Sequence, residues 1–165
     1  MVDAFKERAM SQCVIQGVFT DTGRAAIAQS MLGPLVRPPY NETYFTYFKI
    51  GTGGYLLGPG GSKQPKTPDP SLTDIESDSV SGLFEYEKTL TASDLSLEVD
   101  GTITYAKLRC FLDYTEANDD GSGNSPEFFE IGIFDPNNVM LIYATFPGET
   151  KNASKTLNHI IKANF

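Results

Sequence analysis

The C-terminal part of the chain constrains the fold most, because it has the pattern of three strands joined by two turns. Residues 128–134 and 139–146 are short runs of aromatic and β-branched side chains. Asp135-Pro136-Asn137-Asn138 lies between them and has the composition of a tight turn. Two such runs around a four-residue turn predict a β-hairpin. Pro147-Gly148 is expected to end the second run, and residues 156–163 alternate apolar and polar side chains as a third strand does.

Alternation within this predicted hairpin indicates which side chains share a face. Ile131 should lie on the same side as Ile133, and Leu141 on the same side as Tyr143. Lys151 follows the second strand in a segment expected to be a polar turn. We therefore expect the hairpin to be structural core.

Further strands are predicted upstream, at residues 13–19, 44–50, 83–90, 94–100 and 102–114. Asp100-Gly101 should form the turn before the last of them. That strand alternates well, and one face carries Ala106, Leu108, Cys110, Leu112 and Tyr114. Cys110 is therefore expected in the core.

One helix is clearly indicated at residues 22–32. Thr20-Asp21 offers an N-cap, and Gly33-Pro34 should end the helix. Its expected apolar stripe consists of Ala25, Ala28, Met31 and Leu32, with Ile27 at the edge. Residues 1–12 have the spacing of a short N-terminal helix, which either docks on a neighbouring subunit or folds onto its own domain.

These elements predict an α+β fold, mainly antiparallel β and sandwich-like, with one amphipathic helix near residues 22–32 and a short N-terminal helix. Residues 1–12 form the arm or helix, and residues 13–165 form a single domain.

Charge and composition exclude several classes of function. The formal net charge is −8 and basic residues do not cluster, which argues against nucleic-acid binding. No apolar run is long enough to span a bilayer, so we expect no membrane partner. The N-terminus lacks the apolar region of a secretory signal, and Cys13 and Cys110 are therefore expected to be reduced thiols.

Two loops have compositions that can bind ions. Residues 116–127 place oxygen-bearing side chains at calcium-loop spacing, and the candidate ligands are Glu116, Asn118, Asp120 and Glu127. The first position is Glu rather than Asp, Pro126 precedes the last Glu, and the flanks are strand-like, so a solvated hairpin tip is expected instead. The glycines of residues 51–54 follow a strand but lack the Lys-Ser/Thr of a phosphate-binding loop, so no cofactor is expected.

No catalytic constellation is present in the sequence. The single histidine, His159, alternates with Leu157 and Ile161 and is expected in the core or an interface. No serine lies in a nucleophile motif, and no Cys/His group has metal-ligand spacing. We expect the protein not to be an enzyme.

Four segments, in order, carry a resemblance to a known family. They are VFTDTGRAAIAQSML (residues 18–32), FKIGTGG (48–54), PDPSLTDIE (68–76) and EIGIFD (130–135), the last followed by Lys151. Together they resemble the N-terminal domain of phage tail-collar fibre proteins. Family members usually continue into a long fibre, whereas this sequence stops at Phe165, which puts receptor binding in doubt.

The resemblance implies a virion protein of the phage tail, assembled in the host cytoplasm. Such a protein docks on the baseplate or tail tip, attaches or connects tail fibres, and forms a homotrimer. Lys151 is where the resemblance places a lysine, and it is a candidate for contact with a partner. Pro68 and Asp69 belong to the Gly/Pro-rich loop of residues 58–71, which either presents itself to a neighbouring subunit or is a mobile surface loop.

A second hypothesis is a small carbohydrate-binding β domain that recognises the host surface. Its support is an aromatic run that could stack on sugars, namely Tyr40, Tyr44, Phe45, Tyr47 and Phe48. Tyr44 and Tyr47 are therefore interaction candidates on this alternative, although such strands more commonly pack into a core.

Overall fold

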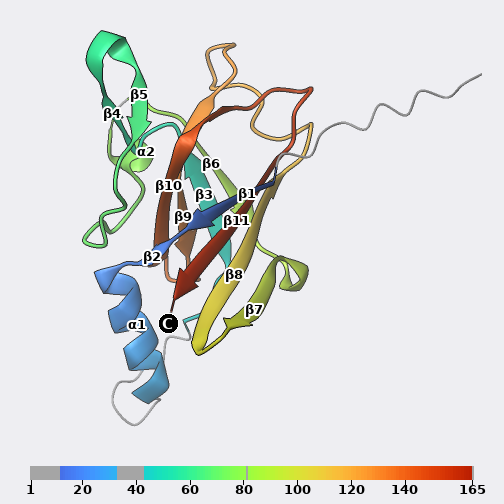
Figure 1. The fold of residues 1–165 in the computed structure, drawn as a ribbon. Coiled ribbons are helices and arrows are strands. Elements are labelled where there is room, and N and C mark those ends of the chain that lie inside the picture. The colour runs from blue at the N-terminus through green and yellow to red at the C-terminus, as the bar shows by residue number, and fades with distance from the viewer. Residues whose placement is uncertain (1–11, 33–42, 81, 165) are drawn as a thin grey trace, which may run out of the picture.

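Two β-sheets face each other in a computed structural model that describes residues 12–32, 43–80 and 82–164 (Figure 1). One sheet, here the β8 sheet, has the order β1 (Gln12–Gln16), β11 (Leu157–Asn164), β8 (Ile103–Leu112), β7 (Leu95–Asp100). The other, the β9 sheet, has the order β2 (Val18–Phe19), β10 (Met140–Thr150), β9 (Glu127–Phe134), β3 (Tyr47–Gly51), β6 (Glu85–Thr89). The predicted mainly antiparallel, sandwich-like fold is confirmed.

The remaining elements are short. They are α1 (Asp21–Leu32), α2 (Glu76–Ser79), the β-hairpin of β4 (Tyr55–Leu57) and β5 (Lys63–Pro65), and the 3₁₀ turns Pro59–Gly61 and Ala92–Asp94. The β4–β5 hairpin occupies half of the predicted loop of residues 58–71. Of the predicted N-terminal arm, residues 1–11 lie outside the described part of the chain.

The chain passes from one sheet to the other at Gly17. β1 pairs in parallel with β11 in the β8 sheet, and β2 pairs with β10 in the β9 sheet. A Cβ atom at Gly17 would lie 2.7 Å from Ile142 and 2.8 Å from Ile161, one residue from each sheet. Only glycine therefore lets the backbone cross between the two layers here.

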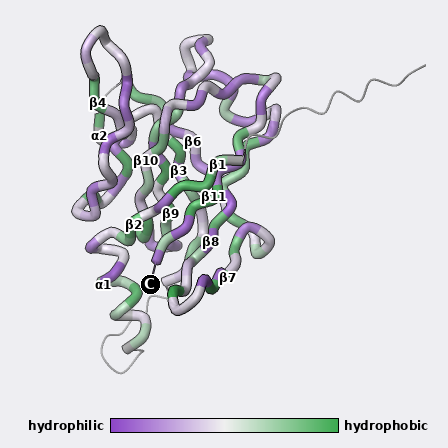
Figure 2. Tube along the Cα trace, in the orientation of Figure 1, coloured by the Kyte–Doolittle hydropathy of each residue, from purple (hydrophilic) through white to green (hydrophobic). Residues whose placement is uncertain are grey.

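The main hydrophobic core fills the space between the sheets. It is built from buried aliphatic and aromatic side chains of both inner faces, among them Ile15, Phe48, Ile50, Leu108, Leu112, Ile131, Ile133, Ile142 and Ile161. Cys110 is 1% exposed and belongs to this core, as predicted. Figure 2 shows apolar residues concentrated on the strands and hydrophilic residues on the connecting loops.

The C-terminal hairpin forms as predicted, with two differences. β10 runs through Pro147-Gly148 to Thr150 instead of ending there, because a register shift between Thr145 and Glu149 accommodates the proline outside the regular ladder. A second shift between Met140 and Ile142 places Leu141 in the main core and Tyr143 in a separate cluster. The expectation that Leu141 and Tyr143 share a face is therefore wrong.

The N-cap of α1 is confirmed, whereas its predicted apolar stripe is wrong. Thr20 Oγ1 accepts a hydrogen bond from Gly23 N at 2.9 Å, and Gly23 lies against the backbone of Leu141. This contact turns Ala26 and Ile27 towards the core, because positions three and four residues apart share a helix face. The predicted stripe faces outwards instead, with Ala25, Ala28 and Met31 exposed.

Ile133→Ala should lower the free energy of unfolding by about 2–5 kcal/mol, since it leaves a cavity between the sheets. Ile133 is completely buried. Val14→Ala is the matched control, because the Val14 side chain is 60% exposed on β1 and its truncation should change stability little. Urea unfolding of both variants checks this, and equal stability losses would show that the hairpin is not core.

Candidate functional site

The outer face of the β9 sheet carries buried polar side chains beneath a covering segment, residues 66–80. The strand register sets Glu130 of β9 between Gly51 of β3 and Thr145 of β10. In the adjacent row, Gly132 lies between Lys49 and Tyr143. The glycines leave room for the covering segment: a Cβ at Gly132 would lie 2.7 Å from Ile75.

Glu130 is the centre of this layer and is 0% exposed. Its Oε1 accepts from Ser77 N at 2.8 Å and from Ser77 Oγ at 2.7 Å. Its Oε2 accepts from Glu76 N at 2.9 Å and from Tyr143 Oη at 2.8 Å. Four donors thus satisfy the carboxylate and hold the start of α2 against the sheet.

Tyr143 is held in its protonated, donating form. Burial raises the pKa of the phenol above its usual value, and the nearby Glu130 carboxylate raises it further. The hydroxyl therefore stays a hydrogen-bond donor to Glu130 throughout the physiological pH range.

The turn of residues 51–54 is rich in glycine because its backbone passes close to the Glu130 carboxylate. A Cβ at Gly53 would lie 2.6 Å from Glu130 Oε1, and one at Gly54 would lie 2.7 Å from Glu130 Cβ. Gly53 N donates to Ser77 Oγ at 2.8 Å. The turn therefore faces the protein's own carboxylate and serine, and its glycines serve packing rather than phosphate binding.

Lys49 is the second buried charge on this face. Its Nζ lies 2.8 Å from Asp78, 3.3 Å from Asp74 and 4.0 Å from Glu85, and 5.0 Å from the centre of the Phe134 ring. Burial lowers the pKa of Lys49, but the Asp78 hydrogen bond and the nearby carboxylates outweigh it and raise the pKa above its usual range. Lys49 therefore remains a cation that ties Asp74 and Asp78 of the covering segment to β3.

Further contacts fasten the same segment at both ends. Lys66 Nζ lies 2.7 Å from Glu76 Oε1, and Lys66 N donates to Gly54 O at 2.9 Å. Asp21 N donates to Pro70 O at 2.8 Å, which joins the start of α1 to it. The arrangement positions a surface segment, and Glu130 has no exposed atom with which to reach a substrate.

His159 is buried, as predicted, at 1% exposure. The register places it between Cys13 of β1 and Cys110 of β8, and its ring packs on Phe146 with centroids 4.4 Å apart. Its nearest described charged partner is Glu149, with Nε2 3.5 Å from Oε1. Burial raises the pKa of both cysteine thiols, so neither is an activated nucleophile.

Lys151 is not the accessible residue of a polar turn. It is 0% exposed, and its Nζ donates to Asn118 Oδ1 and, at 3.1 Å, to Asn152 O. Burial lowers its pKa. The expectation of an accessible lysine in a polar turn is therefore wrong, and a Lys151→Glu variant would be destabilised, because a glutamate there would place a carboxylate beside two acceptor oxygens.

The four candidate calcium ligands do not converge. Glu116 pairs with Lys88 at 2.6 Å, Asn118 with Lys151, and Glu127 with Lys63 at 3.1 Å. Asp120 accepts from Ser122 N at 2.8 Å within its own turn. Within residues 12–32, 43–80 and 82–164, no three His, Cys, Asp or Glu side chains are grouped to hold a metal ion.

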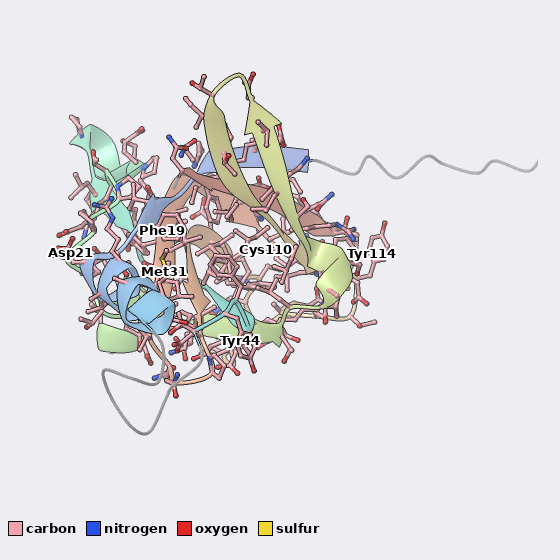
Figure 3. All side chains as sticks on the ribbon, turned by 90° about the horizontal axis from the view of Figure 1, so that it is seen from below. Phe19, Asp21, Met31, Tyr44, Cys110 and Tyr114 are labelled. Atoms are coloured by element: carbon pink, nitrogen blue, oxygen red, sulfur yellow. The ribbon has the colours of Figure 1, made fainter. Side chains whose placement is uncertain are left out.

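The aromatic run does not form one stacking surface. Phe48 and Phe45 pack into or against the main core, and Tyr47 stacks on Phe134 with centroids 5.1 Å apart. Tyr44 is 54% exposed (Figure 3), and Tyr40 lies outside the described residues. Of the other interaction candidates, Pro68 is half-buried and Asp69 is exposed.

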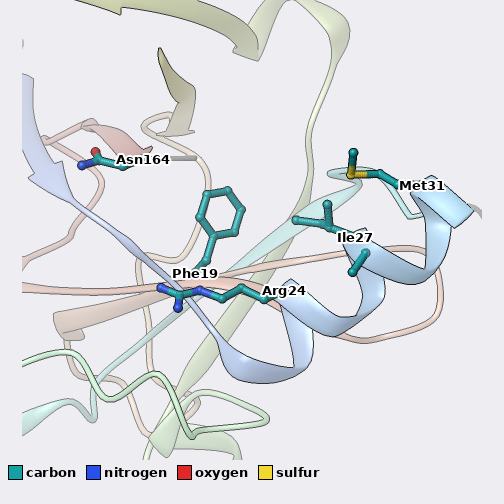
Figure 4. A pocket seen from close by; sticks show the side chains of 6 residues that line it. Phe19, Arg24, Ile27, Met31 and Asn164 are labelled. Atoms are coloured by element: carbon teal, nitrogen blue, oxygen red, sulfur yellow. The ribbon is translucent and has the colours of Figure 1, made fainter. Parts of the chain in front are cut away.

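Two of the hollows on the described surface lie beside the β4–β5 hairpin and beside α1. A polar cleft of about 510 Å³ lies between the β4–β5 hairpin and the loop before β9; its lining includes Thr52, Tyr55, Lys63, Asp120, Ser122 and Glu127. An apolar groove of about 280 Å³ lies beside α1, lined by Phe19, Arg24, Ile27, Ala28, Met31 and Asn164 (Figure 4).

Searches of protein-family models, curated proteins and solved structures found no match to this chain. None of the helices in the described part of the chain is long and apolar enough to cross a membrane.

Tyr143→Phe should lower the free energy of unfolding by about 1–3 kcal/mol, because it leaves one lone pair of the buried Glu130 carboxylate without a donor. Tyr105→Phe is the matched control: the Tyr105 ring lies under Lys162 Nζ, 5.8 Å from its centroid, and a phenylalanine keeps that contact. Equal unfolding midpoints for the two variants in guanidinium would contradict the assigned role of Glu130.

Acid should selectively remove the contribution of Glu149. The neighbouring His159 ring and Lys155, whose Nζ lies 3.0 Å away, lower the pKa of Glu149 from 4.5 to about 2. Since the pKa is lower in the folded state, the carboxylate stabilises the fold above the unfolded pKa and loses this effect as the pH falls towards the folded value.

We therefore expect the difference in melting temperature between the parent and Glu149→Gln to be largest above pH 5 and to shrink towards pH 2. Thermal melts across this range measure it. A difference that stays constant down to pH 2 would show that Glu149 is not stabilised in its charged form.

Proposed function

We propose that this chain is a structural protein of a phage tail. It docks on the baseplate or tail tip as part of a homotrimer, attaches or connects tail fibres, and has no catalytic activity. The observation that carries this proposal is that contacts join the four segments of the collar-fibre resemblance, which are scattered along the sequence. Three of them build the polar layer on the outer face of the β9 sheet, and residues 18–32, whose helix packs on the main core, join that layer through one backbone hydrogen bond.

Contacts between these segments define the unit. Residues 130–135 supply Glu130, and residues 68–76 supply Glu76, whose backbone N–H donates to that carboxylate at 2.9 Å. Residues 48–54 supply the glycine turn around Glu130. Residues 18–32 join through Asp21 N and Pro70 O at 2.8 Å. A resemblance that maps onto one connected network is better support than four separate matches.

The chemistry of this unit supports a scaffold rather than an enzyme. Its buried charges are matched by donors or by opposite charges, and they hold a surface segment in one conformation. A segment fixed in this way suits docking, because little conformational entropy is lost when a partner binds. Asp69 is exposed within it and accepts from Ser71 N at 2.9 Å, which stiffens the turn that a partner would meet.

Carbohydrate binding is the second candidate, now at the polar cleft instead of the aromatic run. The cleft combines carboxylates and hydroxyls with the side chain of Tyr55, which are groups that hydrogen-bond to sugars and pack on them. Saccharide titration of the purified chain separates the two proposals. Saturable binding that is lost in Asp120→Asn would favour this candidate.

The tail proposal is tested in purified particles of the phage that encodes the chain. Mass spectrometry should find the protein, and antibody labelling should place it at the tail. Asp69→Lys should reduce its incorporation several-fold, because Asp69 is exposed in the proposed docking segment, while the protein remains folded in a thermal melt.

Asp119→Lys is the matched control. Asp119 is also an exposed aspartate that accepts a backbone bond two residues along, from Gly121 N at 2.6 Å, but it lies in the loop before β9. It should incorporate normally. Particles that lack the protein, or equal incorporation of the two variants, would count against the tail role or the docking segment respectively.

A further inference from the structure

β7 is an edge strand whose side chains are unusually apolar for its position. In the β8 sheet it pairs with β8 on one side and has no described neighbour on the other. Leu97 is 72% exposed and Val99 is 68% exposed. Edge strands are normally protected by charges, bulges or cover. The β9 sheet follows this rule, since its edge strand β6 carries Glu85, Glu87 and Lys88.

The apolar face of β7 continues the main core outwards. The register places Leu97 opposite Ala106 and Leu95 opposite Leu108, and both partners are core residues. Beside them lies an apolar hollow of about 270 Å³ whose lining includes Phe45, Leu95, Leu97 and Leu108. The β7–β8 hairpin projects from the body of the sandwich (Figure 3), so this face is accessible to another molecule.

The turn of the hairpin decides which backbone groups of β7 point outwards. Asp100 pairs with Ile103 across a two-residue turn in which Gly101 has φ +62°. Such a turn closes on a hydrogen-bonded pair, and hydrogen-bonded pairs then alternate along the strands. Asp100, Glu98 and Ser96 therefore direct their backbone groups to β8, and Leu95, Leu97 and Val99 direct theirs to the open edge.

This pattern is self-complementary when two copies of β7 pair over Leu95 to Val99. Two copies of β7 can pair antiparallel about a two-fold axis at Leu97. The backbone N–H and C=O groups that point outwards from one copy then meet those of the other, with Leu97 opposite Leu97 and Leu95 opposite Val99. A shift of the register by one residue would set residues whose backbone groups point outwards opposite residues whose backbone groups already bond to β8. A shift of two would set Glu98 opposite Glu98, and like charges directly opposite are destabilising.

Charge favours this register between Leu95 and Val99, and the pairing ends there because Asp100 would lie opposite Asp94 of the second copy. Glu98 would lie opposite Ser96 of the second copy, so its charge meets a neutral side chain. Each Glu98 is already paired on its own sheet, with Lys162 at 2.7 Å and Lys107 at 3.3 Å. The contact would bury Leu95, Leu97 and Val99 from each copy on one face without burying an unpaired charge.

We propose that two copies of this chain associate in solution through antiparallel pairing of β7 about a two-fold axis at Leu97, which joins their β8 sheets into one continuous sheet. This contact does not depend on the tail role. It differs from the interface of a three-fold assembly because both copies contribute the same surface, β7, to the contact.

The first experiment measures the mass of the full chain by analytical ultracentrifugation over a range of concentrations. The parent should show a concentration-dependent dimer. Leu97→Lys should be monomeric, because it sets two cations opposite each other on the axis. Leu56→Lys should dimerise like the parent, because Leu56 is similarly exposed, at 59%, but lies on β4.

Opposite charges placed at position 97 then test whether the two-fold axis lies at that residue. Leu97→Lys and Leu97→Glu should each be monomeric alone and should form a heterodimer when mixed. Circular dichroism melts check that both variants remain folded. A monomeric parent, a dimer that survives Leu97→Lys, or a mixture that stays monomeric would each overturn the proposal. A trimer unaffected by Leu97→Lys would also overturn it, while leaving the tail role open.

Cross-linking fixes the register. In an antiparallel hydrogen-bonded pair, opposite Cα atoms lie about 5.5 Å apart, within reach of a disulfide. Under oxidation Leu97→Cys should form a covalent dimer with itself. Glu98→Cys should not, and efficient cross-linking of Glu98→Cys instead would reject the register proposed here.

Discussion

The buried carboxylate of Glu130 is the interaction on which the outer half of this protein depends. A charge with no solvent exposure is tolerated only if donors replace the water it has lost, and here those donors come from the start of α2 and from Tyr143. Meeting this requirement brings Ser77 to the sheet, requires glycine at positions 51 and 53, and seats Ile75 over Gly132. One buried acidic residue in a mostly apolar strand thus organises three segments that are distant in sequence.

Sequence reasoning predicted the sandwich well because its strands alternate strongly and their turns have distinctive residues. The C-terminal hairpin, the Asp100-Gly101 turn and the burial of Cys110 and His159 all follow from period and turn chemistry. The errors arose where a tertiary contact overrides the local pattern. The face of α1 is set by the contact of Gly23 with β10, and the face of Leu141 is set by a register shift.

The polar layer was harder to predict, because single residues do not reveal their partners. Glu130 within FFEIGIF and Lys49 within YFTYFKI were the available signals, since a charge in a buried strand has to be matched. Periodicity could not indicate that their partners are Ser77, Asp74 and Asp78. Lys151 shows the same limit, because its polar surroundings suggested solvent and the structure encloses it beside Asn118.

The parallel pairing of β1 with β11 gives the sandwich a mechanical property. Gln12 lies opposite Asn158 and Gln16 opposite Lys162, so the start of β1 and the end of β11 are at opposite ends of the same strand pair (Figure 1). A pull applied between residues 12 and 164 therefore acts along both strands, and it loads their hydrogen bonds together in shear instead of opening them one by one. Forced unfolding is governed by the rate of barrier crossing, and simultaneous rupture raises that barrier. Tension between the two ends of this strand pair is therefore borne by all of its hydrogen bonds at once.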